Sequence, residues 1–396
     1  MGLNGQQVTV VGAGIAGLAL ARALALRGAK VTVLEQADAI REVGAGLQIS
    51  PNGAAVLQAL GLGPALEAAS VRAAAVELRD GLDGRIVTRL DLAKLRPGEG
   101  WHFLHRADLI GLLLDGARAA GVDLRLLQKV ASVDLSGSRP RLVMTTGAET
   151  EAGLLLGTDG LHSPVRAALT GKVAPFFTHQ IAWRALVPCD PAEPPVAEVH
   201  MGEGRHVVSY PLRGGTLRNI VAVEERRQWV EEGWSLRDDP IELRLAFESF
   251  GPRVRGWLEQ VTDVWLWGLF RHPVAKRWHR MLPDGVVAIA GDAAHPTLPF
   301  LAQGANMALE DVWTLAAALD AAGDDQATAA LAGWERARAP RCARIVEAAN
   351  RNARAYHLSG PLRPMAHAAL RLAGRAAPGL ALSRYDWIYR FDPTGA

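Results

Sequence analysis

The chain has 396 residues, of which 49% are hydrophobic and 21% charged, a composition typical of a globular protein with a substantial core. The formal net charge is only +2, and acidic residues are interleaved with the arginines, so the chain lacks the basic footprint of a nucleic-acid-binding protein. Its two cysteines fit no metal or disulfide pattern, and no apolar run reaches the roughly 18 residues of a membrane span. These features predict free thiols in a cytoplasmic protein without a membrane segment.

The first 35 residues alternate between strand-like and helix-like segments. A β-branched run at residues 7–11 stops at a glycine, apolar residues then recur with helical spacing over residues 15–26, and a second β-branched run follows at residues 30–34. Strand, glycine turn, helix and strand within about 30 residues indicate a βαβ unit. Further elements are predicted as strands at residues 124–130, 142–146 and 154–156 and as a helix at residues 109–120.

The character of the sequence changes in the second half of the chain. Residues 173–272 contain several prolines, short strand-like runs and six of the eleven tryptophans, which indicates a second, sheet-rich domain inserted into the first. Residues 286–290 return to the pattern of a buried strand, and long helix is predicted over residues 304–355. The predicted division is a body formed by residues 1–172 and 273–396, interrupted by the inserted domain.

The first glycine turn has the spacing of a dinucleotide fingerprint. Gly12 permits a sharp turn, Gly14 lets the backbone approach a diphosphate, and Gly17 allows close packing of helix and strand. The helix N-terminus that follows favours negative charge. Glu35 ends the second strand, where a carboxylate binds ribose hydroxyls. This first motif predicts a dinucleotide site without specifying the dinucleotide.

Two later segments also place acidic and glycine residues after an apolar strand. Asp159 and Gly160 form the second motif, followed by a predicted helix start. Gly291 and Asp292 begin the third motif, which continues to the helix that starts at Gly304. Each segment alone is compatible with an ordinary strand-to-helix turn. Their joint occurrence with the first motif, in this order, is the more informative observation.

Together the three motifs resemble the class A, single-component FAD-dependent aromatic hydroxylases, the family of para-hydroxybenzoate, salicylate and 3-hydroxybenzoate hydroxylases, over nearly the whole chain. The resemblance implies an α/β fold with a Rossmann-like, glutathione-reductase-like FAD-binding domain, an inserted sheet-rich substrate domain and C-terminal helices. It implies FAD as cofactor, NADH or NADPH as cosubstrate, and O2 activated as a flavin C4a-hydroperoxide that hydroxylates a small aromatic acid or phenol. Dimers are common in the family, so a homodimer is the assembly it suggests.

The resemblance also assigns residues to FAD. In the family, the first motif holds the ADP half, the second motif serves both FAD and the nicotinamide donor, Asp292 binds the ribityl chain, and the backbone from Gly304 to Asn306 faces the isoalloxazine. The residues expected to bind the cofactor are Gly12, Gly14, Ala16, Gly17, Glu35, Gln36, Arg41, Gly46, Arg106, Val130, Asp159, Gly160, Arg166, Gly291, Asp292, Gly304, Ala305 and Asn306.

Hydroxylation of a phenol also requires a base near the substrate hydroxyl, because loss of the phenol proton makes the ring more nucleophilic. His206 and Tyr210, four residues apart on a predicted strand, point to the same face and are the candidates for this base and for substrate binding. Their spacing resembles the His/Tyr pair of 3-hydroxybenzoate 6-hydroxylases. Leu298, Pro299 and Phe300 are expected to border the substrate ring, although the 3-hydroxybenzoate enzymes carry glutamine where Pro299 falls.

Several alternatives remain open on the sequence. The same flavin machinery serves epoxidases and oxidases of larger apolar substrates, and a flavin-binding regulator without turnover is a third interpretation. Arg184 and Arg213 are candidate contacts for a substrate carboxylate, with a surface position as the more ordinary interpretation of each. His102 and His105 lack the partner ligands of a metal site, so no metal is predicted.

Overall fold

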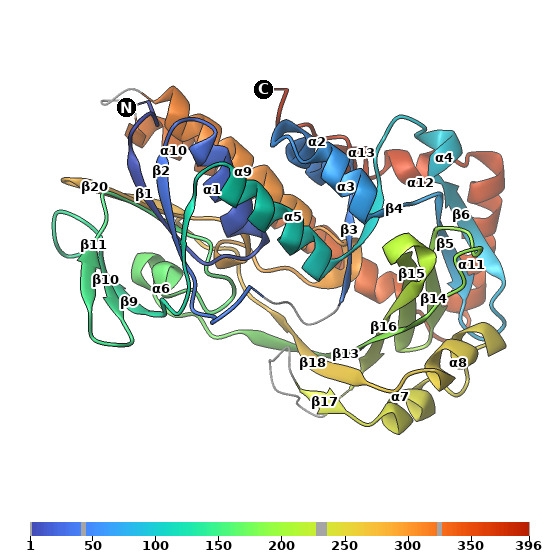
Figure 1. Ribbon diagram of the computed structural model, residues 1–396. Coiled ribbons are helices and arrows are strands. Elements are labelled where there is room, and N and C mark those ends of the chain that lie inside the picture. The colour runs from blue at the N-terminus through green and yellow to red at the C-terminus, as the bar shows by residue number, and fades with distance from the viewer. Residues whose placement is uncertain (1, 41–44, 227–235, 323–326, 396) are drawn as a thin grey trace.

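The structure is a computed structural model that describes residues 2–40, 45–226, 236–322 and 327–395 (Figure 1). One end of the molecule contains a six-stranded sheet in which five neighbouring strands run parallel and one edge strand runs antiparallel. The strands of this sheet are, in spatial order, β19 (His279–Leu282), β20 (Gly285–Ile289), β12 (Leu154–Gly157), β1 (Gln7–Val11), β2 (Lys30–Leu34) and β8 (Asp123–Arg125).

The central strands of this sheet are almost entirely apolar because both of their faces are covered. Val10 and Val33 are fully buried, as is Leu155 on β12. Helix α1 (Ile15–Ala25) follows β1 and packs against α5 (Arg106–Ala119) and α9 (Gly304–Ala321). A small antiparallel sheet stands beside α6 (Pro164–Thr170), with strands β9 (Val130–Asp134), β10 (Arg141–Met144) and β11 (Glu149–Glu151).

The other end contains an eight-stranded sheet that is antiparallel except for the pair β14 and β5. Its strands are, in spatial order, β17 (Arg237–Asp238), β18 (Val264–Arg271), β13 (Phe176–Pro188), β16 (Leu217–Glu225), β15 (Arg205–Leu212), β14 (Val196–Gly202), β5 (Ala75–Asp80) and β6 (Ile86–Asp91). Six strands fall within the predicted insertion, whereas β5 and β6 come from residues 75–91 of the predicted body. The sheet therefore extends beyond the predicted segment, because β5 pairs with the exposed edge of β14.

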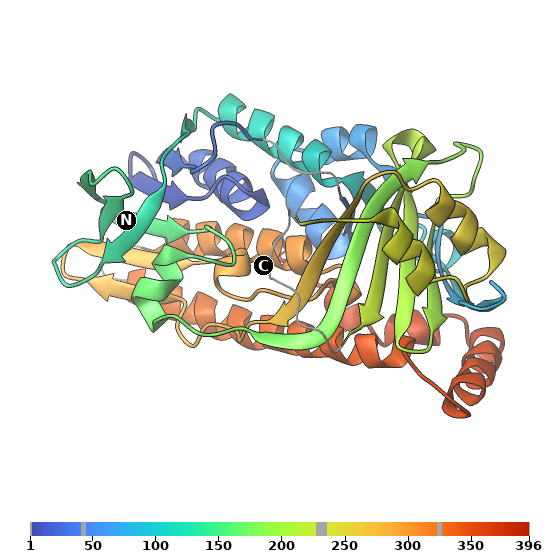
Figure 2. The same ribbon diagram turned by 90° about the horizontal axis from the view of Figure 1, so that it is seen from below.

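The two faces of the eight-stranded sheet have different coverings. On one face, a core around Trp183 and Val207 packs against α7 (Pro240–Ala246) and α8 (Pro252–Glu259). The opposite face, here called the front face, packs Ala182 and Val223 into the core of the body that contains the six-stranded sheet. The front face is therefore the surface of the sheet that meets the body (Figure 2).

Helices from the C-terminal third join the two ends. The long helix predicted over residues 304–355 is instead two helices, α9 and the 30-residue α10 (Ala327–Tyr356), which runs from the body toward the front face (Figure 2). The other elements are β3 (Gly46–Ile49), β4 (Val71–Arg72), β7 (His102–His105), α2 (Pro51–Ala59), α3 (Gly63–Ala69), α4 (Leu92–Leu95), α11 (Leu362–Ala376), α12 (Leu380–Ser383) and α13 (Asp386–Tyr389), with short 3-10 turns at Arg213–Gly215, Gly291–Ala293 and Pro299–Leu301.

The α/β fold class is confirmed, and Cys189 and Cys342 are both free thiols. Among the helices that the structure describes, none combines the length and apolar character needed to cross a membrane.

Candidate active site

The three motifs converge at the carboxyl ends of neighbouring parallel strands. Val11 at the end of β1 is in register with Gly157 of β12, and Gly157 is in register with Ile289 of β20. The residues that follow each strand therefore emerge side by side. Ligands of open parallel sheets bind at this edge.

Two glycines make this convergence possible. Gly12 has a φ of 97°, and a Cβ there would stand 2.6 Å from the carbonyl oxygen of Thr158, so the first motif lies directly against the second. Gly291 has a φ of 63°, and its Cβ would stand 3.1 Å from the Cβ of Ala16. A Cβ at Gly14 would meet nothing within 4 Å, which leaves this part of the turn open for a diphosphate.

Glu35 shapes the loop next to the first motif. Its carboxylate accepts hydrogen bonds from the backbone N–H groups of Ala13, at 2.8 Å, and Ala37, at 2.9 Å. The Gln128 N–H donates to the Glu35 carbonyl and brings the segment leading to Val130 alongside. Glu35 thus holds the glycine turn in addition to any contact with ribose, while Gln36 is exposed beside it.

We expect Glu35→Ala to weaken FAD retention by about tenfold or more, because it removes two hydrogen bonds to a charged acceptor next to the diphosphate turn. The dissociation constant, measured by the fluorescence of released FAD, tests this expectation. Asp38→Ala removes the same charge from an exposed position three residues away and serves as the control. Equal FAD affinity in both variants would contradict the assignment of Glu35.

Asp159 of the second motif has an incompletely satisfied carboxylate. Its Oδ2 accepts a hydrogen bond from the Val165 N–H at 3.2 Å, whereas its buried Oδ1 has no hydrogen-bond partner among the described residues. Burial raises the pKa of Asp159 to about 6. A buried carboxylate oxygen beside an open glycine turn fits the polar groups of a dinucleotide, so the residues present are suited to FAD.

Other predicted cofactor residues have protein partners for their side chains. The Arg166 guanidinium donates to the carbonyls of Ala293, at 3.2 Å, and Pro273, at 2.6 Å. The Asn306 amide donates to the Gln48 carbonyl, and its oxygen accepts from the Ser50 N–H. These side chains therefore join the loops that surround the candidate site.

The remaining predicted cofactor residues lie around the same edge. Gly304 and Ala305 begin α9, and Asp292 is exposed after β20. Arg106 begins α5, and its N–H donates to the Ala45 carbonyl, next to Gly46 on β3. Gly17 is buried in α1, and Gly160 has a φ of 76°. Arg41 lies outside the described residues.

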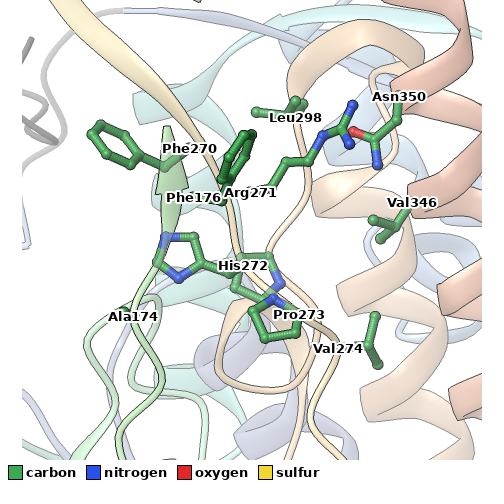
Figure 3. A pocket seen from close by; sticks show the side chains of 11 residues that line it. Ala174, Phe176, Phe270, Arg271, His272, Pro273, Val274, Leu298, Val346 and Asn350 are labelled. Carbon is green, nitrogen blue, oxygen red and sulfur yellow. The ribbon is translucent and has the colours of Figure 1, made fainter. Parts of the chain in front are cut away.

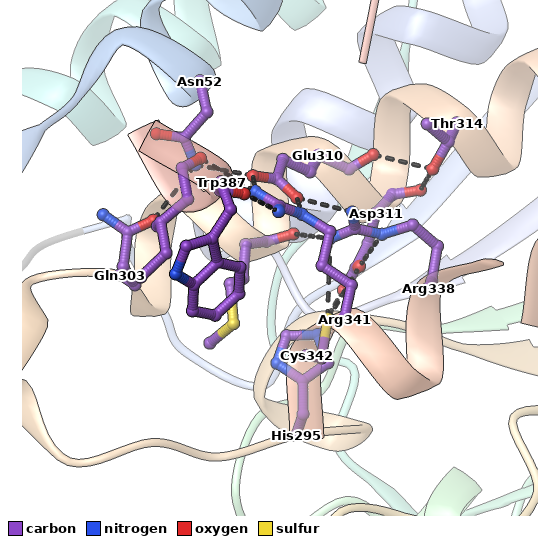
Figure 4. A network of polar contacts seen from close by, with 12 residues as sticks. Asn52, His295, Gln303, Glu310, Asp311, Thr314, Arg338, Arg341, Cys342 and Trp387 are labelled. Carbon is purple, nitrogen blue, oxygen red and sulfur yellow. Dashed lines mark hydrogen bonds and ion pairs between the residues drawn. The ribbon is translucent and has the colours of Figure 1, made fainter. Parts of the chain in front are cut away.

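A buried ionic network underlies the third motif (Figure 4). Asp311 on α9 accepts hydrogen bonds from the Gly291 N–H, at 3.1 Å, and from the Arg338 Nε, at 2.8 Å, and is paired with His295. The neighbouring Glu310 also binds Arg338 and is bound in addition by Arg341 and Asn52. The Asp311 carboxylate raises the pKa of His295 well above its usual value despite burial. The network fixes the loop after β20 to α9 and α10.

The predicted substrate residues lie on the front face. His206 and Tyr210 of β15 are in register with Val223 and Asn219 of β16, so both side chains point to the same side of the sheet. The Gly46 N–H donates to the Asn219 side-chain oxygen at 2.8 Å, and a Cβ at Gly46 would stand 2.7 Å from the Tyr210 ring. Tyr210 is therefore in contact with the strand that the resemblance places beside the flavin.

Burial has opposite effects on the pKa values of His206 and Tyr210. Burial lowers the pKa of His206 well below 6.5, so its imidazole is neutral near pH 7 and able to accept a proton. Burial raises the pKa of Tyr210 above its usual range and keeps its hydroxyl protonated. Of the two candidates, His206 is the group whose protonation state suits a base.

Arg184 on β13 is a buried arginine of the front face. It is in register with Val221 of β16, its guanidinium stacks 4.1 Å from the centre of the Trp267 ring, and its charge acts on the Tyr210 hydroxyl. The surface interpretation of Arg184 is wrong, because only 8% of the residue is exposed. Arg213, in contrast, is exposed and paired with Asp108 at 2.9 Å.

The predicted substrate loop divides between two places. Phe300 lies near His206, with ring centres 5.7 Å apart, whereas Pro299 is exposed. Leu298 lines a cavity of about 430 Å³, bordered by the end of β18 and by α10 (Figure 3). His206 and Tyr210 do not line this cavity. Phe300 is therefore the loop residue that the structure brings to the candidate base.

Two residues that no sequence pattern indicated lie in line with His206. His357, just after α10, is within 2.7 Å of His206, and Glu225 at the end of β16 is within 2.7 Å of His357. They are 151 and 19 residues from His206 along the chain and belong to no recognisable spacing. The pairing of β15 with β16 brings Glu225 to the same end of the sheet as His206.

Known proteins match almost the whole chain. The family model described as an FAD binding domain matches residues 6–349. A 3-amino-4-hydroxybenzoate 2-monooxygenase of Streptomyces platensis is 35% identical over 404 residues, covering 99% of this chain and 98% of the relative. A 3-hydroxybenzoate 6-hydroxylase of Klebsiella oxytoca is 33% identical, with 89% of each chain covered. The fold is similar to that of a solved salicylate hydroxylase substrate complex, with 24% identity, a TM-score of 0.80 and coverage of 99% of this chain and 97% of that one.

Proposed function

The chain belongs to the class A FAD-dependent aromatic hydroxylases, and we propose that it hydroxylates a phenolic aromatic acid held on the front face by His206, Tyr210 and Arg184. It is an FAD-dependent monooxygenase that uses NADH or NADPH and O2. The relatives' names support hydroxybenzoates as the substrate class. The observation that carries the proposal is the placement of a buried histidine and a buried arginine on one face of the sheet, beside Tyr210, which contacts β3.

Each group has a distinct task in this proposal. When bound, FAD supplies the reducing equivalents from NADH or NADPH and the activation of O2. His206 accepts the proton of the substrate hydroxyl, and Tyr210, which stays protonated, donates a hydrogen bond. Arg184, stacked on Trp267, binds the carboxylate and orients the ring. Phe300 packs beside the His206 ring, with ring centres 5.7 Å apart, and adds an apolar surface for the substrate ring.

A panel of substrates tests the proposal. We expect 3-amino-4-hydroxybenzoate or 3-hydroxybenzoate to accelerate NAD(P)H oxidation and to yield a product heavier by one oxygen atom, because the front face provides both a base and a cation. The decarboxylated analogues, 2-aminophenol and phenol, are expected to have a KM at least about tenfold higher, since they lose a charge-assisted contact. Product mass and oxygen consumption are the measurements.

The variant Arg184→Met separates recognition of the acid from the chemistry. It should raise the KM of the acids toward that of the decarboxylated analogues, whose own KM should not change. Arg213→Met, which removes an exposed arginine paired with Asp108, is the matched control. NAD(P)H oxidation that yields only hydrogen peroxide for every acid, or preferential turnover of a large apolar alkene, would contradict the proposal and favour the oxidase or epoxidase alternative.

Homodimer formation and a cytoplasmic location also stay proposals.

A further inference from the structure

A continuous chain of hydrogen bonds leads from the candidate base to the protein surface. Nδ1 of His206 is 2.7 Å from Nε2 of His357, and Nδ1 of His357 is 2.7 Å from Oε1 of Glu225. His206 is 1% exposed and His357 is 7% exposed, whereas the Glu225 side chain is 53% exposed. The chain therefore begins in the interior and ends in solvent.

Three separate parts of the fold hold these residues in place. The pairing of β15 with β16 sets His206 opposite Val223, two residues before Glu225. The Glu225 N–H donates to the Gly204 carbonyl at 2.8 Å and fixes the end of the hairpin. His357 arrives from the body, at the end of α10, and packs its ring 4.9 Å from that of His206.

Glu225, at the surface end of the chain, sets which atom donates in each hydrogen bond. A Glu225 carboxylate can only accept, so Nδ1 of His357 must donate. A neutral His357 then has an unprotonated Nε2, which accepts from Nδ1–H of His206. A neutral His206 in this tautomer has its lone pair on Nε2, the nitrogen that remains to accept a proton from a substrate hydroxyl.

We propose that His206, His357 and Glu225 form a proton relay that carries the substrate's hydroxyl proton from the front face to solvent. This inference rests on the proposed function, because it takes a phenol as the proton donor. His206 is the catalytic residue of the relay, and His357 and Glu225 act through it as positioning and transfer residues.

The proton transfers through the relay leave no positive charge on either buried histidine. The phenol proton moves to Nε2 of His206 as the Nδ1 proton of His206 moves to Nε2 of His357. The Nδ1 proton of His357 moves in turn to Glu225, from which water removes it. Both imidazoles end neutral in the opposite tautomer, and return of a proton to the product hydroxyl restores them. This route suits a site where burial lowers the pKa of both histidines.

Among the residues that the structure describes, the charged and titratable neighbours do not interrupt the chain of hydrogen bonds. Arg205 lowers the pKa of His357, and it is itself paired with Glu224 at 3.3 Å. Tyr356 lies with its ring 5.2 Å from that of His206, and burial keeps its hydroxyl protonated. Glu225 is the acidic group that raises the pKa of His357 and opposes these effects.

The first experiment follows deprotonation without turnover. Oxidised holoenzyme is mixed rapidly with 3-amino-4-hydroxybenzoate or 3-hydroxybenzoate in the absence of NAD(P)H, and phenolate absorbance and proton release to a pH indicator are recorded. His357→Gln retains an acceptor for His206 and a donor for Glu225 but cannot pass a proton in this way. We expect it, and Glu225→Gln, to slow both signals by at least about tenfold, with ligand affinity nearly unchanged.

Two comparison variants distinguish transfer from packing. Glu203→Gln removes an equal charge from an exposed position in the turn between β14 and β15 and should behave as the wild type. His357→Phe removes both hydrogen bonds and should be at least as slow as His357→Gln. Wild-type rates in His357→Gln, with or without a defect in His357→Phe, would overturn the relay and leave His357 a structural support.

A second experiment needs no substrate and therefore separates failure of the relay from failure of the proposed function. In ligand-free holoenzyme with 15N-labelled histidine, His206 and His357 are expected to be neutral Nδ1–H tautomers at pH 7, assigned with the His357→Gln variant. An Nε2–H tautomer at His206 would overturn the relay even if the enzyme hydroxylates a phenol. Correct tautomers with no turnover of any phenol would instead contradict the proposed substrate class.

Discussion

The variant His206→Ala is expected to retain FAD and to hydroxylate about a hundredfold more slowly than the wild type, because it removes the group that accepts the substrate proton. FAD retention should persist, since the glycine motifs and Glu35 lie at the edge of the six-stranded sheet and not on the front face. The measurements are kcat for hydroxylated product and the flavin content of the purified protein.

The pH dependence gives the same assignment an independent test. Because burial lowers the pKa of His206, its imidazole stays neutral below pH 6.5. We therefore expect kcat/KM to fall only at a still lower pH, where His206 becomes protonated and can no longer act as the base. Tyr210→Phe is the companion variant, and we expect a smaller loss because the tyrosine hydroxyl stays protonated. A larger loss in Tyr210→Phe than in His206→Ala would transfer the role of base to Tyr210.

Arg338→Met is expected to destabilise the protein by about 3–5 kcal/mol, since it removes one partner from a buried ionic network and leaves its carboxylates undercompensated. Arg338 is 2% exposed and binds both Asp311 and Glu310, which are themselves fully buried. Urea unfolding followed by tryptophan fluorescence measures the loss, with and without saturating FAD.

The same helix supplies the control for this variant. Arg351→Met removes an arginine of α10 whose partner, Glu347, is also exposed, and it should cost less than about 1 kcal/mol. Comparable unfolding midpoints for the two variants would show that the buried network contributes little. Because Asp311 also binds the Gly291 N–H, the unstable variant should release FAD more readily as well.

Local sequence patterns predicted the parts of the molecule that depend on neighbours in the chain. The strands at residues 7–11 and 30–34 agree with β1 and β2, and the glycine turn between β1 and α1 is where the spacing placed it. A period-two face likewise put His206 and Tyr210 on one side of β15. The steric limits of the backbone and the alternation of side chains along a strand are sufficient to determine these features.

The features that the sequence did not predict depend on distant pairings. β5 joins the eight-stranded sheet through β14, more than 100 residues later, so no local pattern could reveal it. Arg184 is buried because Trp267 of another strand stacks on it, and an arginine by itself suggests a surface position. His357 meets His206 only because α10 extends across both parts of the fold.

The strand order of the two sheets has a consequence for synthesis of the protein on the ribosome. Every strand of the eight-stranded sheet lies within residues 75–271, so that sheet can close before the C-terminal third has been made. The six-stranded sheet needs β20, and its ionic network needs Arg338 of α10. The glycine turn between β1 and α1 is therefore synthesised long before β20 and Arg338, which complete the site around it. Until β20 has been made, the apolar edge of β12 stays unpaired and prone to aggregation.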